Sequence, residues 1–179
     1  MKKTGASRIV TDAMLAAMYV VLSSWLSLSL WNLKLSVDAL PILVAGLLFG
    51  PVDGFAVGFV GEMLSQILGP YGLAITSPLW AVPPAVRGLI AGLYMLCAKD
   101  SLKRPGLFAM LSLSALLVTG LTTAVMALDA KLLHYAFAAT IPSVIWRVIS
   151  GLILAVAFTA ILPPILRRIR SAMHMDQKQ

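Results

Sequence analysis

Charged residues are scarce in this chain of 179 residues: Asp, Glu, Lys and Arg make up 12% of it, whereas 60% of its residues are hydrophobic. Soluble globular proteins carry about 25% charged and about 45–50% apolar residues. The composition therefore argues against a soluble domain and against a disordered chain. The net charge of +7 does not indicate a nucleic-acid binder, because the basic residues lie between long apolar segments.

Side chains and motifs typical of enzymes are also missing. The single cysteine, Cys97, excludes an internal disulfide and a cysteine-based metal cluster. The sequence has no phosphate-binding loop of the G-x-x-x-x-G-K-(S/T) type, no H-E-x-x-H zinc helix and no G-x-S-x-G nucleophile turn. We therefore expect a binding or partner subunit rather than an enzyme, with no cofactor and no metal. Any ATP-driven work would depend on other subunits.

Long apolar segments dominate what is present. Six of them, separated by Gly-Pro pairs and polar clusters, cover residues 10–30, 39–49, 52–68, 78–98, 107–128 and 141–162. A spanning helix needs about 20 apolar residues, so the second segment indicates a short or tilted helix, or one arm of a re-entrant hairpin. We predict an all-α polytopic membrane protein, a single domain over residues 1–179 with six transmembrane helices in a compact bundle.

The basic residues predict the orientation of this bundle. Cytoplasmic loops of membrane proteins carry an excess of Lys and Arg. With six spans, one side holds ten of these residues and the other side holds only Lys34 and Lys131. We therefore expect both termini to be cytoplasmic. The ten are Lys2, Lys3, Arg8, Lys99, Lys103, Arg104, Arg167, Arg168, Arg170 and Lys178.

Three ionisable residues fall inside the apolar segments: Glu62, Arg87 and Arg147. Each costs about 2.5–3.5 kcal/mol to insert, so such groups face a protein interior or a water-filled cavity. Gln66 lies at i+4 from Glu62 and shares its helix face. We expect these four side chains to converge on a cavity open to the outside. The alternatives are an ion pair of Glu62 with either arginine that locks helices together, or an Arg147 that reaches the outer interface.

One carboxylate cannot neutralise two arginines, and the sequence places Asp38 and Asp129 near the outer loops. Arginine binds carboxylates with two parallel hydrogen bonds. We therefore expect the second positive charge in the cavity to meet an anionic group on a ligand.

Two tryptophans extend this hypothesis. Trp80 lies seven residues before Arg87, and Trp146 directly precedes Arg147. Both are candidates to stack on a planar ligand, whereas Trp25 and Trp31 fit an interfacial aromatic belt. The first outer loop, residues 31–38, is short enough to act as a lid over the opening.

Small residues repeat at a spacing that brings helices together in lipid. Gly46/Gly50, Gly54/Gly58 and Gly88/Gly92 have the G-x-x-x-G spacing and are expected to pack the bundle. Ala13 and Ala17 form an A-x-x-x-A ridge in the first segment. This ridge either packs internally or forms a surface for another membrane subunit.

Residues 38–58, DALPILVAGLLFGPVDGFAVG, resemble a segment of the S components of energy-coupling factor (ECF) vitamin transporters. The A-x-x-x-A at Ala13 and Ala17 matches the motif with which that family contacts its transmembrane coupling subunit. The length and the six segments agree with the family over the whole chain, although the specific matches lie within residues 13–61. The resemblance implies a six-helix bundle in a prokaryotic cell membrane that captures a vitamin from outside. Its expected partners are a coupling subunit and two ATPases.

The segments around Gly69–Leu73, Thr76–Trp80 and Pro83–Gly88 look most like the folate branch of that family. Folate has carboxylates for the arginines, a pterin edge for Glu62 or Gln66 and a flat ring for tryptophan. Pantothenate, cobalamin and a queuosine precursor remain alternatives. Two other classes also stay open: a membrane enzyme or assembly factor without a known motif, and a stand-alone ion-coupled carrier.

Overall fold

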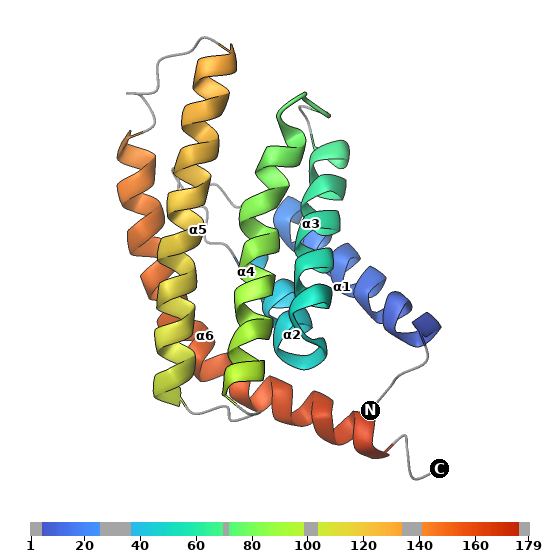
Figure 1. The fold of residues 1–179 in the computed structure, drawn as a ribbon. Coiled ribbons are helices and arrows are strands. Elements are labelled where there is room, and N and C mark those ends of the chain that lie inside the picture. Colours follow the sequence, from blue (N-terminus) through green and yellow to red (C-terminus); the bar gives the residue numbers. More distant parts are fainter. Residues whose placement is uncertain (1–4, 26–36, 70–71, 99–103, 134–140, 176–179) are drawn as a thin grey trace.

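The computed structural model describes residues 5–25, 37–69, 72–98, 104–133 and 141–175, and its regular structure there is entirely helical. Figure 1 shows the arrangement of the helices. They are α1 (Gly5–Trp25), α2 (Ala39–Phe49), α3 (Pro51–Leu68), α4 (Ser77–Cys97), α5 (Arg104–Leu133) and α6 (Ile141–Met175). This result confirms the all-α prediction.

Helix α4 is the centre of the bundle, because it packs against α2, α3 and α5. Glycines bring α2, α3 and α4 into backbone contact. A Cβ atom at Gly88 would lie 2.0 Å from the carbonyl oxygen of Gly54, and one at Gly46 would lie 2.5 Å from that of Gly88. The structure confirms internal packing for five of the six predicted glycines, whereas a Cβ at Gly50 would meet nothing within 4 Å. The five are Gly46, Gly54, Gly58, Gly88 and Gly92.

The short second segment is a buried helix with the bounds that the sequence predicts. Its hydrophobic side chains pack on α1, α3, α4 and α6, and Ile42 and Leu43 are almost completely buried. Gly50, with φ at +111°, makes the turn into α3, and Pro51 begins that helix. A positive φ of this size favours glycine, so the Gly50-Pro51 pair fixes the α2–α3 connection.

Three of the described helices, α4, α5 and α6, are long and apolar enough to cross a membrane. Helices α1 and α3 have 21 and 18 residues, and α2 has 11. Six spans with cytoplasmic termini therefore stay a prediction. Residues 26–36, which include the predicted end of the first span, lie outside the described part.

Helix α6 is longer than the predicted sixth segment and bends near Pro163 and Pro164. After the bend it lies across the end of the bundle where α1 and α5 begin (Figure 1). Proline breaks the helical hydrogen-bond ladder and kinks a helix. Leu162 and Leu166 on either side of the bend are fully buried, so α6 packs onto the bundle around the bend instead of continuing along its axis.

Candidate functional site

A cavity of about 230 Å³ lies between the helices. Each of the six described helices contributes residues to its wall, and Asp38, directly before α2, contributes as well. Ligand pockets are mostly apolar with a small number of placed polar groups, and this wall has that character. Its charged and aromatic members are Tyr19, Asp38, Glu62, Trp80, Arg87, Arg147 and Phe158. In the described residues no group of three or more His, Cys, Asp or Glu side chains is placed to hold a metal ion.

Glu62 is held from two directions at this cavity. The Tyr19 hydroxyl on α1 donates a hydrogen bond to one carboxylate oxygen. The amide of Gln66, one turn along α3, donates to the other oxygen at 3.1 Å. Gly61 permits this approach, because a Cβ there would lie 2.8 Å from the Tyr19 ring. Carboxylates accept several hydrogen bonds at once, so Glu62 keeps acceptor capacity toward the cavity.

The two arginines enter the cavity from different helices, Arg87 from α4 and Arg147 from α6. The one ion pair among the described residues joins Arg8 and Asp53, so Glu62 locks neither arginine. Asp38 also lines the cavity and interacts electrostatically with Arg87. The sequence places Asp38 near an outer loop but does not identify it as a neighbour of Arg87. Arg147 is thus the cavity arginine with no carboxylate paired to it in the described part of the chain.

Hydroxyl groups on α5 and α6 form a further part of the cavity wall. Ser114, Thr119 and Thr122 line the cavity, and each donates its proton to a backbone carbonyl one turn earlier at 2.8 Å. Ser150 donates to the Arg147 carbonyl at 3.2 Å. A hydroxyl that has donated its proton still accepts. This wall therefore offers acceptors to a ligand, whereas the arginines offer donors.

Of the two tryptophans predicted to stack on a ligand, only one lines the cavity. Trp80 lines the cavity. Trp146 is 36% exposed on the outer surface of α6 and is not among the cavity residues, since consecutive helix positions face different directions. Trp31 and most of the proposed lid, residues 31–36, lie outside the described residues, and so does the side chain of Trp25.

Of the predicted site residues, Glu62, Trp80, Arg87 and Arg147 line one cavity, and Gln66 supports Glu62 without lining it. The sequence interpretation missed Tyr19 and Asp38. Tyr19 resembles any aromatic residue of an apolar segment, and its partner lies 43 residues away. Asp38 carried a usable signal, because an acidic residue directly before a short buried helix stands at the positive end of that helix dipole.

The A-x-x-x-A ridge lies outside the bundle. Ala13 and Ala17 are exposed, as are their neighbours Met14, at 68%, and Met18, at 49%. The structure therefore argues against internal packing of the ridge, and its role as a surface for another subunit stays a prediction.

Comparison with known proteins identifies a family whose model matches most of this chain. Residues 3–164 match the model of the family described as "ECF-type riboflavin transporter, S component". A UPF0397 protein of Lactobacillus johnsonii is 36% identical over 97 residues, which cover 52% of this chain and 50% of the relative. A UPF0397 protein of Vibrio atlanticus is 32% identical over 57 residues, 32% of this chain and 30% of the relative. The matched region thus spans half the length, or less, of these curated relatives.

Proposed function

Because this chain belongs to the ECF-type riboflavin transporter S component family, we propose that it is the substrate-binding subunit of an ECF vitamin transporter. In this role the cavity between the helices receives a water-soluble vitamin from outside the cell. Partner subunits hydrolyse ATP, which agrees with the absence of a nucleotide-binding motif in the sequence. The membrane is the cytoplasmic membrane of a prokaryote.

The observation that carries the ligand chemistry is Arg147, which lines the cavity and has no ion-pair partner among the described residues. A guanidinium in a partly apolar cavity is costly unless an anion meets it, and its donors match a carboxylate. Trp80 lines the same cavity, and its indole ring can stack on a flat ring of a ligand. These features support a planar, anionic vitamin.

Folate is our first candidate. Its carboxylates would meet Arg147 and Arg87, its pterin ring would lie against Trp80, and the donor groups on the pterin edge would face Glu62. Gln66 would act by holding Glu62 in place.

Riboflavin is the second candidate, and the description of the matching family favours it. Its ring would also use Trp80, and its ribityl hydroxyls would donate to the hydroxyl wall of Ser114, Thr119 and Thr122. Riboflavin carries no charge, however, so it leaves Arg147 without an anion.

Mass spectrometry of the small molecule that co-purifies with the detergent-solubilised protein tests the proposal. We expect a vitamin in stoichiometric amount, and isothermal titration with folic acid and with riboflavin then separates the two candidates. A protein that purifies empty and binds no member of a vitamin panel contradicts the proposed function. Uptake that persists after deletion of the ATPase subunits indicates a stand-alone carrier instead.

The partners follow from the same proposal. The exposed face of α1 around Ala13 and Ala17 would contact the transmembrane coupling subunit, since small residues allow helix backbones to approach closely in lipid. Two ATPase subunits complete the transporter.

A further inference from the structure

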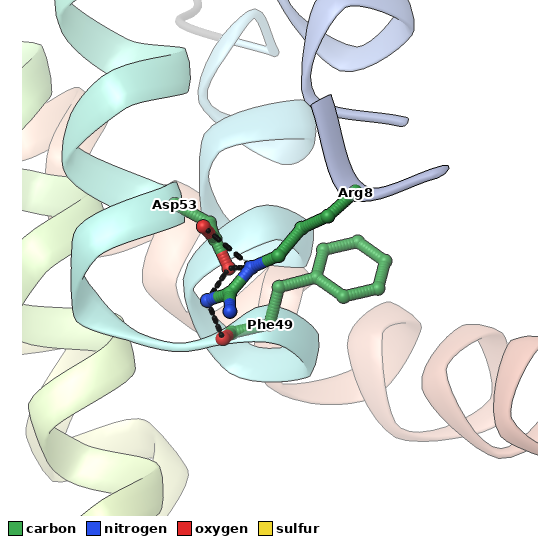
Figure 2. A network of polar contacts seen from close by, with 3 residues as sticks. All are labelled: Arg8, Phe49 and Asp53. Atoms are coloured by element: carbon green, nitrogen blue, oxygen red, sulfur yellow. Dashed lines mark hydrogen bonds and ion pairs between the residues drawn. The ribbon is translucent and has the colours of Figure 1, made fainter. Parts of the chain in front are cut away.

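Three helix ends meet at one arginine. Figure 2 shows Arg8 of α1 reaching the α2–α3 turn, where its guanidinium contacts both Asp53 and Phe49. The Nε atom donates to the two Asp53 carboxylate oxygens at 2.9 and 2.8 Å. The Nη2 atom donates to Asp53 and to the carbonyl oxygen of Phe49 at 3.1 Å.

Both of these contacts suit the charge of a helix end. The Phe49 carbonyl belongs to the last turn of α2, where the helix dipole favours a positive charge such as the Arg8 guanidinium. Asp53 lies in the first turn of α3, where the helix dipole favours a negative charge. The Asp53 side chain is 7% exposed and that of Arg8 is 47% exposed, so a charge-assisted fork closes over a nearly buried carboxylate.

This contact lies in the first turns of α1, where the side chains are less buried than farther along the helix. From Arg8 to Met14 each side chain is exposed or half-buried, whereas farther along α1 Ala16 and Tyr19 are 3% and 4% exposed. Arg8 and Tyr19 lie on the bundle side of α1, and Ala13 and Ala17 lie on the opposite, exposed side. The ridge therefore begins in a stretch that Arg8 joins to the α2–α3 turn.

We infer that Arg8 is a positioning residue for partner docking. By fixing the first turns of α1 to the α2–α3 turn through Asp53 and Phe49, it presents the Ala13–Ala17 face in one orientation to the transmembrane coupling subunit. Arg8, Phe49 and Asp53 are not among the residues that line the cavity. This inference rests on the proposed function, because it takes the coupling subunit as the partner of that face.

The test is recovery of the coupling subunit and ATPases with an affinity-tagged chain from membranes that co-express all of them. We compare Arg8→Gln, Asp53→Asn and the charge-swapped double variant Arg8→Asp/Asp53→Arg with the unchanged protein. Arg104→Gln is the matched control, since Arg104 is an exposed arginine in the first turn of α5. Loss of the fork should lower recovery about fivefold or more, the swap should restore at least half of it, and the control should leave it unchanged.

Binding of folic acid and riboflavin and the thermal unfolding midpoint in detergent are measured on the same variants. Vitamin binding should stay close to that of the unchanged protein if Arg8 positions the docking face. The unfolding midpoint should fall in Arg8→Gln, because the nearly buried Asp53 carboxylate loses its partner. Unchanged recovery in Arg8→Gln overturns the inference. A joint loss of recovery and vitamin binding also overturns it, because the ion pair would then hold the whole bundle together.

A second measurement needs no partner. Spin labels at Met14→Cys on α1 and Leu113→Cys on α5, in a Cys97→Ser background, report the position of α1 relative to the bundle. Arg8→Gln should broaden the distance distribution, and an unbroadened distribution overturns the inference. If the unchanged protein recovers no partner subunits, the proposed function fails together with the inference. If the unchanged protein and Arg8→Gln recover them equally, only the inference about Arg8 fails.

Discussion

Tyr19 and Glu62, 43 residues apart in the sequence, share a hydrogen bond across the contact between α1 and α3. The bond joins the helix that carries the exposed alanine ridge to the acidic wall of the cavity. Gly61 makes the approach possible, because any larger residue would collide with the Tyr19 ring. One helix thus carries both a cavity residue and the candidate partner surface.

Removal of the Tyr19 hydroxyl should destabilise the protein. In Tyr19→Phe, one oxygen of the half-buried Glu62 carboxylate loses its donor, and a hydrogen bond to a charged group contributes about 1.5–3 kcal/mol. We expect a lower unfolding midpoint in detergent and weaker vitamin binding. Tyr94→Phe is the control, because Tyr94 lies on α4 outside the cavity wall. Equal midpoints and affinities for the two variants would contradict a role for the Tyr19–Glu62 bond.

Substitution of Arg147 should distinguish the two candidate vitamins. Hydrogen bonds to charged groups contribute about 1.5–3 kcal/mol, so Arg147→Gln should weaken folic acid binding by about 10-fold to 100-fold. Binding of uncharged riboflavin should change little. Arg168→Gln, an exposed position on the same helix, serves as the control. Isothermal titration measures both ligands, and undiminished folic acid binding would show that Arg147 meets no anion.

A methyl group at Gly88 should be poorly tolerated. The new Cβ in Gly88→Ala would lie 2.0 Å from the Gly54 carbonyl oxygen, so α3 and α4 would have to separate. We expect a large fall in folded yield and in the unfolding midpoint. Gly120→Ala provides the contrast: a Cβ there meets nothing within 4 Å, and alanine is favoured over glycine inside a helix by about 0.5–1 kcal/mol. Similar behaviour of the two variants would contradict the backbone contact between α3 and α4.

The sequence predicts those features of the fold that depend on local patterns. Apolar length and Gly-Pro breaks place the helices, including the bounds of the short α2, and the G-x-x-x-G spacing identifies the tightly packed helices. It also identifies Glu62, Arg87 and Arg147, because a charge inside an apolar segment is rare and expensive. These signals need no knowledge of the tertiary arrangement.

The remaining features depend on where helices lie in three dimensions. The sequence cannot show that Tyr19 rather than an arginine holds Glu62, since the choice depends on how α1 crosses α3. Nor can it show that Trp146 faces outward while Arg147 faces inward, because the rotation of α6 is set by packing. Pro163 and Pro164 lie at the bend of α6, but the side to which the helix turns depends on packing around the buried Leu162 and Leu166.

Enlargement of the α1 ridge should block assembly without disturbing the bundle. Ala17→Leu adds volume on an exposed face where close helix approach depends on small residues. We expect reduced recovery of the coupling subunit, with vitamin binding and the unfolding midpoint unchanged because no buried contact is altered. Ala109→Leu is the matched control, an exposed alanine on α5. If both variants assemble equally well, the coupling subunit does not dock on the ridge. The proposed role of Arg8 in orienting the ridge for docking would then be contradicted too.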